Sequence, residues 1–301
     1  MSLLVTGSIG IDTVITPHGE ASEVLGGSAV YFGFAASLFT QVRLVGAVGD
    51  DFPAHFRDLL ASTQMDITGL ETRSGSKTFR WTGKYSPDMN DRDTLDVQLN
   101  VLAEDAPPVP DAFADSDVVF LANAHPAQQR AMLNEVPNAR LSVCDTMDLW
   151  IDAERDELLK TLAAVDGVII NDGEARMLTD QTNLVLAGRA ILDLGTEFVV
   201  IKKGEHGAML VTAEAVTTVP AYPTTEVRDP TGAGDSFAGG MLGFLDQMGT
   251  FDAETLRRAV VRGTVAASFT IEAFSLDRLR QVTQDDIEQR VRSFVDMLRI
   301  E

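Results

Sequence analysis

The sequence predicts an α/β fold in which helices flank a mostly parallel sheet. Short apolar runs recur along the chain, and most are bounded by Gly, Asp or Asn, which is typical of strands buried on both faces of a parallel sheet. Amphipathic segments of helix length lie between these runs, so strands and helices alternate as in βαβ units. With 301 residues, 45% of them hydrophobic, the chain can bury a sizeable core, and we predict one domain over residues 1–301.

The elements follow the chain in a regular order. Strands are predicted at residues 3–7, 42–49, 117–123, 141–145, 167–171, 198–204 and 207–212. Helices are predicted at residues 27–39, 52–63, 127–136, 154–164, 173–179 and 183–194. From Asp235 onward the pattern becomes helical, with helices expected at residues 235–248, 253–271 and 283–299.

One region interrupts this alternation. Residues 74–101 contain "KTFRWTGKYS" and "DTLDVQLNV", two segments with period-two alternation, separated by the polar turn "PDMNDR". We interpret this hairpin, together with residues 12–25, as a small β lid inserted into the main domain. The alternative is an edge hairpin without a role. The exposed edges of such a hairpin could be covered by a second subunit, which favours a homodimer formed through the lid.

Composition excludes some partners. Asp and Glu number 45 and Lys and Arg 24, which gives a net charge of −21, so no nucleic-acid surface is expected. Cys144 is the single cysteine, which excludes an internal disulfide and favours a reducing cytoplasm. The N-terminus "MSLLVTGSIGID" has no signal-peptide pattern. No run reaches the roughly 18 apolar residues of a membrane span.

The stretch "DPTGAGDSF" is the strongest candidate for chemistry. Gly232, Ala233 and Gly234 leave their backbone amides unobstructed just before a helix, and a helix N-terminus with free amides binds anions. Asp235 would lie in this turn, where it could take the proton of a hydroxyl that attacks a phosphoryl group. The alternative is an ordinary turn and helix cap. The chain contains neither a GxxxxGK[ST] loop nor a GxGxxG after the first strand, which argues against a P-loop and a dinucleotide-binding dehydrogenase.

The full stretch "DPTGAGDSFAGG" resembles the C-terminal signature of the ribokinase (PfkB) family of carbohydrate kinases. The resemblance extends over nearly the whole chain, in the family's order. It is carried by "GSIGID" (7–12), "GGSAVYFGFAASLF" (26–39), "VRLVGAVGDDFPAHF" (42–56), "NDGEARML" (171–178) and "IKKGEHGAML" (201–210). It implies a ribokinase-like three-layer sandwich, with a mostly parallel central sheet flanked by helices and a small β lid.

The resemblance also implies roles for residues near the phosphates. Asp235 matches the catalytic base, and Gly232, Ala233 and Gly234 match the anion hole. Asn171 and Glu174 match the family's Asn-x-x-Glu motif, associated with Mg²⁺ and the nucleotide phosphates, with Glu174 expected to act on the metal through water. The same two residues are equally compatible with a helix cap.

Further matches concern the two substrates. Lys203 and Gly204 are expected near the nucleotide phosphates, Thr231 near phosphate or a monovalent cation, and Ala267 in the nucleotide's base pocket. Gly26 and Gly27 match the N-terminal di-glycine signature of the substrate site. Asp12 matches the aspartate that accepts hydrogen bonds from substrate hydroxyls.

The sequence departs from the family pattern at Tyr31, where many sugar kinases carry an Asn that contacts the sugar. A phenol cannot replace the amide's paired donor and acceptor. It could stack on a ring face or make one hydrogen bond. This puts ribose in doubt and leaves room for another sugar, a cyclitol or a nucleoside.

The expected activity is therefore an Mg²⁺- and ATP-dependent transfer of the γ-phosphoryl group to an alcohol of a sugar or sugar-like substrate, in the cytoplasm. A nucleoside or inositol kinase of the same family is an alternative, as is a kinase-like binding protein without catalysis. The partners are small molecules, with no nucleic acid and no membrane.

Overall fold

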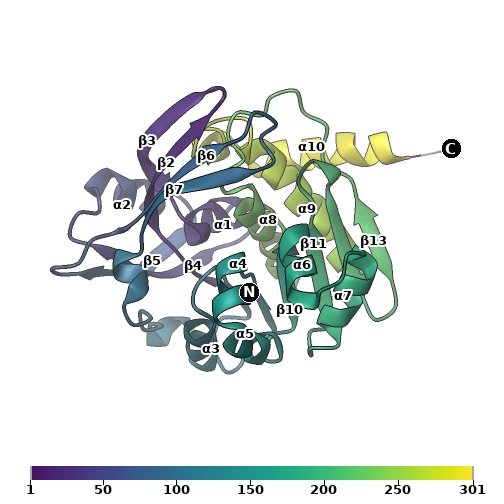
Figure 1. Ribbon diagram of the computed structural model, residues 1–301, viewed down its shortest axis with the longest axis horizontal. Helices are drawn as coiled ribbons and strands as arrows, with labels where there is room; N and C mark the ends of the chain where they lie inside the picture. The colour runs from purple at the N-terminus through teal and green to yellow at the C-terminus, as the bar shows by residue number, and fades with distance from the viewer. Residues whose placement is uncertain (1, 300–301) are drawn as a thin grey trace.

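A nine-stranded sheet forms the middle layer of the protein (Figure 1). The computed structural model describes residues 2–299. The strand order is β13-β12-β11-β10-β9-β8-β1-β4-β5, and neighbours are parallel except β11–β12 and β12–β13. The bounds are β1 (Leu3–Thr6), β4 (Val42–Gly49), β5 (Met65–Arg73), β8 (Val118–Leu121), β9 (Leu141–Cys144), β10 (Gly167–Asn171), β11 (Phe198–Lys202), β12 (Ala208–Thr212) and β13 (Val216–Val219). The predicted mostly parallel sheet is confirmed.

Helices cover both faces of this sheet. Side chains of β1 alternate between two core clusters, because Leu3 and Val5 join one and Leu4 the other. The first cluster contains residues of α1 (Ser28–Ala36), α2 (Ala54–Ala61), α8 (Ala233–Met248), α9 (Ala253–Thr270) and α10 (Gln284–Leu298). The second contains residues of α3 (Pro126–Asn134), α4 (Asp148–Ala153), α5 (Arg155–Leu162), α6 (Asp172–Thr179) and α7 (Leu184–Leu192). The result is the predicted three-layer arrangement.

A separate four-stranded sheet forms the lid. Its order is β3-β2-β6-β7, with bounds β2 (Gly10–Thr16), β3 (Gly19–Gly26), β6 (Phe79–Tyr85) and β7 (Arg92–Gln98). The predicted lid segments, residues 12–25 and 74–101, therefore lie in one sheet, which occupies one side of the molecule away from α6 and α7 (Figure 1). Asp12 lies within β2, two residues after the strand begins.

Three elements were not predicted: β5, β13 and α4. Strand β5 is at the edge of the main sheet, and its burial is irregular, so it shows neither a continuous apolar run nor a clean alternation. Short 3₁₀ turns complete the chain: η1 (Asn100–Ala103), η2 (Asp111–Phe113), η3 (Gly204–His206) and η4 (Leu279–Gln281).

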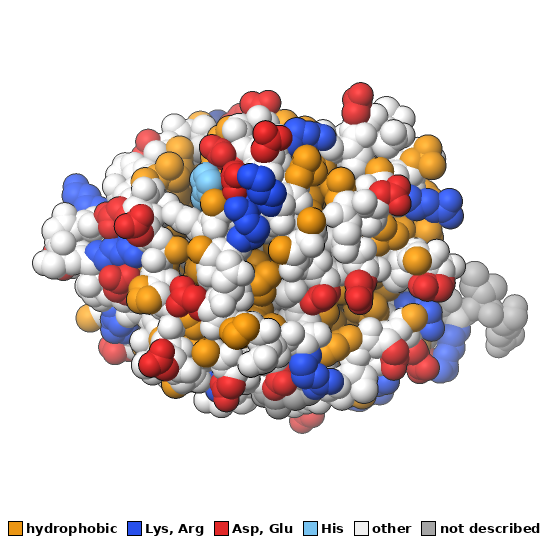
Figure 2. All heavy atoms as spheres, turned by 90° about the horizontal axis from the view of Figure 1, so that it is seen from below, with side chains coloured by type: hydrophobic (Ala, Val, Ile, Leu, Met, Phe, Trp, Pro, Cys, Tyr) orange, Lys and Arg blue, Asp and Glu red, His pale blue; other side chains and the backbone are white. Residues whose placement is uncertain are grey.

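The surface carries both signs of charge. On the face in Figure 2, acidic and basic side chains are interspersed and no basic side chains gather into a broad patch. Among residues 2–299, no helix has the length and apolar character needed to cross a membrane.

Candidate active site

A cleft of about 1660 Å³ lies between the lid and the carboxyl ends of the parallel strands. Residues that end or follow five of these strands line it: Ser8 after β1, Asn123 after β8, Asp145 after β9, Asn171 at the end of β10 and Lys202 at the end of β11. Carboxyl ends of neighbouring parallel strands meet at one sheet edge, which is where open α/β sheets bind ligands. The cleft is large enough for two small-molecule substrates.

The glycine-rich turn opens helix α8 at the floor of this cleft. Gly232 has a φ of +74°, and a Cβ there would come within 2.2 Å of the Tyr31 ring. The amide of Ala233 donates to the Pro230 carbonyl at 3.1 Å, so it is not available to an anion, contrary to expectation. Within residues 2–299, the amides of Gly232 and Gly234 donate to no other residue. These amides and the positive end of the helix dipole offer an anion site.

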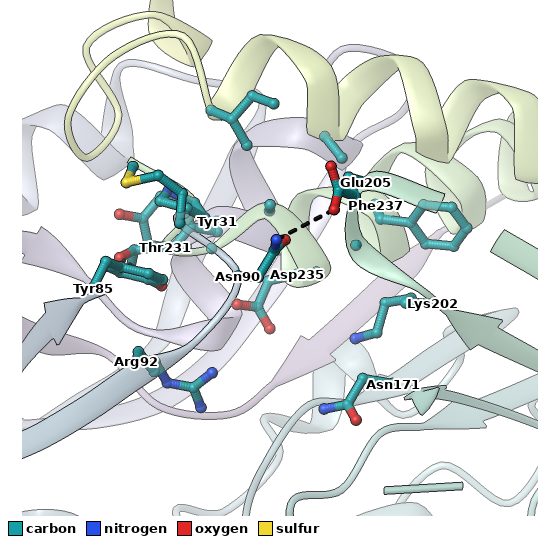
Figure 3. Close-up of a pocket in the computed structure, with 18 of the residues that line it drawn as sticks. Tyr31, Tyr85, Asn90, Arg92, Asn171, Lys202, Glu205, Thr231, Asp235 and Phe237 are labelled. Atoms are coloured by element: carbon teal, nitrogen blue, oxygen red, sulfur yellow. Dashed lines mark hydrogen bonds between the residues drawn. The ribbon is translucent and has the colours of Figure 1, made fainter. Parts of the chain in front are cut away.

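Asp235 lies in the first turn of α8 and faces two cations. In Figure 3 its carboxylate lies between the side chains of Arg92, from the lid, and Lys202, from the main sheet. Burial raises the pKa of the Asp235 carboxyl, and Lys202 and Arg92 act to lower it. A carboxylate with a raised pKa in a buried site is suited to accept a proton from an alcohol.

Lys202 is a site residue that sequence reasoning missed in favour of its neighbour. Its ammonium Nζ would be 2.9 Å from a Cβ at Gly234, and its backbone lies beside Asn171 in the sheet register. The positive charge of Lys202 acts to lower the pKa of Glu174 and Asp145, as well as that of Asp235. Lys203, the predicted residue, also lines the cleft, but no such effect on these carboxyls is found for it.

Asn171 and Glu174 form a reciprocal helix cap. The Asn171 Oδ1 accepts from the Glu174 amide at 2.8 Å, and the Glu174 Oε2 accepts from the Asn171 amide at 2.7 Å. This is the capping box that the sequence also allowed, and both residues line the cleft. Burial is the main cause that raises the pKa of Glu174.

The acidic residues near the phosphate site suit Mg²⁺ held through water. Among the described residues, no three His, Cys, Asp or Glu side chains lie close enough to bind a metal together. Asp145, which was not predicted, is buried, and its Oδ1 has no hydrogen-bond partner within residues 2–299. Oxygen donors of this kind fit Mg²⁺, which keeps several waters and relies on substrate phosphates. The signal for Asp145 was its place after a buried strand, at the same sheet edge as Asn171.

The lid end of the cleft contains a second buried carboxylate. Asp12 is 4% exposed, and its Oδ1 has no hydrogen-bond partner among the described residues. A Cβ at Gly26 would come within 1.9 Å of Asp12 Oδ2, and one at Gly27, whose φ is +105°, within 2.4 Å of the Ser8 carbonyl oxygen. Burial raises the pKa of Asp12 to about 7, with a further contribution from Asp229. Gly26 thus leaves room for the Asp12 carboxylate at the lid end, whereas Gly27 permits the close approach of the Ser8 backbone.

Tyr31 is placed differently from the expectation. Its side chain is 1% exposed and its ring packs against Gly232, so neither ring face is available to stack on an acceptor. Its hydroxyl has no hydrogen-bond partner among the described residues. The sequence suggested two roles for Tyr31, stacking on a ring face or making one hydrogen bond. Only the hydrogen bond is compatible with this position.

Thr231 connects the glycine-rich turn to the lid. Its hydroxyl donates to the Tyr85 hydroxyl of β6 at 3.2 Å. Asp229 supports the turn from below, because its Oδ1 accepts from the Thr231 amide and its Oδ2 from the Ser275 amide. This hydrogen bond therefore joins the glycine-rich turn to the lid.

The far end of the cleft lies between η3 and α9. Gly204, with a φ of +53°, and Lys203 line one wall. Ala267 lines the other, together with Thr264 and Ile271. The small side chain of Ala267 leaves space for a flat base, as expected from the sequence.

The lid wall presents an aromatic surface. Phe79, Trp81 and Tyr85 alternate along β6 and line the cleft. A Cβ at Gly83 would come within 2.0 Å of Trp81 Cη2, so the indole lies across this glycine. The Trp81 Nε1 donates to Thr94 Oγ1 at 3.2 Å, which fixes the orientation of the ring.

Comparison with known families decides the assignment of the chain. Residues 5–279 match the model of the pfkB family carbohydrate kinases. The chain belongs to the PfkB family. As a PfkB kinase it is an ATP-dependent phosphotransferase with a sugar or nucleoside alcohol as acceptor, which confirms the expected activity class. The alternative of a binding protein without catalysis is not retained.

Curated PfkB relatives include nucleoside and riboside kinases. Cytidine kinase of Thermococcus kodakarensis is 32% identical over 250 residues, which is 80% of this chain and 87% of that protein. Aminoimidazole riboside kinase of Salmonella typhimurium is 24% identical over 297 residues, covering 89% of this chain and 88% of that protein.

Solved structures confirm the ribokinase-like fold. The nucleoside kinase of Burkholderia thailandensis in complex with inosine has a TM-score of 0.79 at 18% identity, covering 98% of this chain and 99% of that one. The nucleoside kinase of Methanocaldococcus jannaschii has a TM-score of 0.78 at 18% identity, with 97% and 98% covered. An Escherichia coli ribokinase-like protein of this fold binds ATP and Mg²⁺.

Proposed function

We propose that this PfkB kinase phosphorylates a nucleoside at the primary hydroxyl of its ribose. The observation that carries the proposal is the Trp81 indole, laid across Gly83 in the cleft wall beside Asp12. Asp12 and Trp81 are register partners on the paired strands β2 and β6. A flat aromatic face next to a buried carboxylate matches a substrate with a flat base and hydroxyls.

Each half of a nucleoside has a partner in this arrangement. The base would stack on Trp81, an interaction worth about 1–3 kcal/mol per base in comparable sites. The two carboxylate oxygens of Asp12 would accept from the vicinal 2′ and 3′ hydroxyls. The 5′ hydroxyl then remains to face Asp235. The names of the cytidine kinase and of the inosine-bound nucleoside kinase support this assignment.

In the proposed reaction, the acceptor oxygen attacks the γ-phosphorus of ATP. The new O–P bond forms as the bond from the γ-phosphorus to the β–γ bridging oxygen breaks, and ADP leaves. The carboxylate of Asp235 takes the proton of the acceptor hydroxyl. The amides of Gly232 and Gly234 and the ammonium of Lys202 donate to the phosphoryl oxygens, where charge is concentrated during transfer.

The nucleotide site would be completed by residues on the other side of Lys202. Asn171, Glu174 and Asp145 would hold Mg²⁺ through water, and bound Mg²⁺ would neutralise phosphate charge. Lys203 and Gly204 would lie along the phosphates. Ala267 would face the adenine ring.

Three further expectations remain proposals. A monovalent cation is expected beside Thr231. A homodimer through the lid is supported by the exposed edge strand β7, in which Leu95 and Val97 are 55% and 50% exposed. A cytoplasmic location is supported by the buried free thiol of Cys144.

The test is a panel of acceptors with ATP and Mg²⁺, with ADP release and ³¹P NMR as readouts. Cytidine, uridine, adenosine and inosine are compared with ribose, fructose and myo-inositol. We expect kcat/KM for at least one nucleoside to exceed that for every free sugar by about 100-fold or more. Trp81→Ala should lower kcat/KM for the nucleoside and leave that for ribose unchanged. A free sugar used as well as the best nucleoside would overturn the proposal.

A further inference from the structure

Strand β7 begins with an arginine that points from the lid into the cleft (Figure 3). We propose that this residue, Arg92, is a catalytic residue that binds the transferring phosphoryl group from the side opposite Lys202. The inference deepens the proposed function and rests on it for the identity of the acceptor. Neither the sequence motifs nor the family match assigns a role to Arg92.

The strand register determines where Arg92 lies. Arg92 pairs with Tyr85 across the antiparallel strands β6 and β7, and directly opposed residues share a face of a sheet. Tyr85 bonds to Thr231 of the glycine-rich turn. The Arg92 side chain therefore lies on the lid face that meets this turn. The alternation of β7 agrees, because Arg92 and Thr94 line the cleft whereas Asp93 lines a separate hollow with Lys84 on the outer side.

The guanidinium of Arg92 has no partner in the part of the chain that the structure describes. Within residues 2–299 it makes no hydrogen bond and no ion pair, although the chain has a net charge of −21. Arg80, near the start of β6, is by contrast paired with Glu23 and Asp51. A guanidinium directed into a cleft without a carboxylate partner keeps its donors for an anionic ligand, and its planar fork suits phosphate.

The anionic group that Arg92 would bind is expected to lie beside Asp235. Burial raises the pKa of both Asp235 and Glu174, and the positive charge of Arg92 acts against this rise at both carboxyls. It makes no direct ion pair with either carboxylate, so space for a group remains between the guanidinium and the base. The γ-phosphoryl group must pass next to Asp235 during transfer, because the acceptor hydroxyl gives its proton there. A guanidinium and an ammonium on opposite sides of this point would share the charge of the phosphoryl oxygens.

The lid loop that precedes Arg92 is held to the nucleotide side of the cleft. The Asn90 Nδ2 donates to Glu205 Oε1 at 3.3 Å, which links the lid turn to η3 (Figure 3). Arg92 lies two residues after Asn90, so a closed lid would place the guanidinium of Arg92 beside the phosphates. An open lid would move the guanidinium away from them.

The test compares Arg92→Met, Arg92→Lys and Arg92→Ala with Lys84→Met. Lys84 is a lid cation on β6 that faces away from the cleft, so its replacement removes the same charge without touching the site. With the best acceptor, Arg92→Met should lower kcat by about 10²–10³-fold with an acceptor KM within threefold of wild type. Arg92→Lys should retain an intermediate rate. Guanidinium ion should restore part of the turnover of Arg92→Ala, which a purely structural role would not allow.

A binding measurement keeps this inference separate from the identity of the acceptor. Calorimetry with AMP-PNP and with ADP, both with Mg²⁺, should show Arg92→Met weakened at least fivefold for AMP-PNP and unchanged for ADP. Lys84→Met should match wild type in both titrations and in turnover. If no acceptor of the panel is used, the proposed function fails and the calorimetry alone decides for Arg92. Arg92→Met that keeps wild-type kcat, or, without an acceptor, wild-type AMP-PNP affinity, overturns the inference.

Discussion

Gly26 lies so close to Asp12 that a Cβ at this position would come within 1.9 Å of the Asp12 Oδ2. Asp12 is on β2 and Gly26 ends the neighbouring strand β3, so the glycine leaves room for the carboxylate. Every heavier side chain at position 26 must displace Asp12 or the strand. The first glycine of the di-glycine signature is thus explained by the space that the Asp12 carboxylate occupies.

Gly26→Ala is expected to damage acceptor binding selectively. Displacement of the carboxylate removes hydrogen bonds to a charged group, each worth about 1.5–3 kcal/mol, so the acceptor KM should rise by at least about tenfold. The KM for ATP should stay within twofold, because the change lies at the lid end. Steady-state kinetics with each substrate varied measures both values. Gly75→Ala is the control for backbone strain away from Asp12, because its φ of +81° strains any side chain while the added Cβ meets nothing within 4 Å. An equal rise in acceptor KM there would contradict this explanation.

The raised pKa of Asp12, about 7, predicts a pH-dependent acceptor KM. The ionised carboxylate accepts hydrogen bonds from two hydroxyls, whereas the protonated acid loses part of this capacity. The acceptor KM should therefore fall as the pH rises from 6 to 8, and the KM for ATP should not follow it. The comparison uses initial rates at saturating ATP over this pH range. A pH-independent acceptor KM would rule out Asp12 as the ionising contact.

The same carboxyl should make stability pH-dependent. The folded protein holds a proton on Asp12 up to about pH 7, whereas the unfolded chain releases it near pH 4. The contribution of this group to stability is therefore complete below about pH 4 and is lost as the pH rises through about 7. Asp12→Asn should flatten the fall in unfolding free energy between pH 5 and 8. Urea denaturation at the two pH values measures the difference, and an unchanged slope in Asp12→Asn would contradict it.

Lys202 and Lys203 provide a direct comparison of neighbouring cations. Lys202→Met removes the charge that lowers the pKa of Asp235, Asp145 and Glu174. The pKa of Asp235 should rise, which moves the lower limb of the kcat–pH profile toward alkaline pH and lowers kcat near pH 7. Lys203→Met should leave the profile in place. A shift that appears in Lys203→Met instead would return the role to the residue predicted from the sequence.

Asp235→Asn tests the catalytic base. Its amide cannot take the proton of the acceptor hydroxyl, so kcat should fall by about 10²–10⁴-fold, while ADP affinity stays within a few-fold of wild type. Asp246→Asn is a matched control, since Asp246 is a buried aspartate on the same helix that accepts from Thr40 at 2.5 Å, outside the cleft. The control should lose stability and keep its turnover. Near-normal turnover in Asp235→Asn would remove Asp235 from the mechanism.

Much of the fold followed from the sequence, because the strands of the main sheet are buried on both faces and read as continuous apolar runs. Strand β5 was not predicted, because it is a partly exposed edge strand without a continuous apolar run. The lid strands β6 and β7 were predicted from their alternation, which survives even though β7 is exposed along its whole length. The period-two pattern thus identified an exposed lid strand that has no continuous apolar run.

The site was only partly predictable, because the sequence does not give the direction of a side chain or its contacts with residues far along the chain. Adjacent residues of a strand point to opposite faces, so the sequence could not decide between Lys202 and Lys203 without the sheet's orientation. Tyr31 was assigned to the acceptor because its contact with Gly232, far along the chain, has no local signal. Arg92 was taken as part of a polar turn, since its importance depends on the position of the closed lid.

Asp12 belongs to the lid sheet, whereas Asp235 belongs to helix α8 of the main domain. Asp12, which would select the acceptor, is therefore part of the lid. Asp235, which would take the proton of the acceptor, is part of the main domain. A lid that opened as a unit would carry Asp12 away from Asp235 and so separate the phosphorylated product from ADP on the main sheet. The same movement would then end the reaction and prevent its reversal.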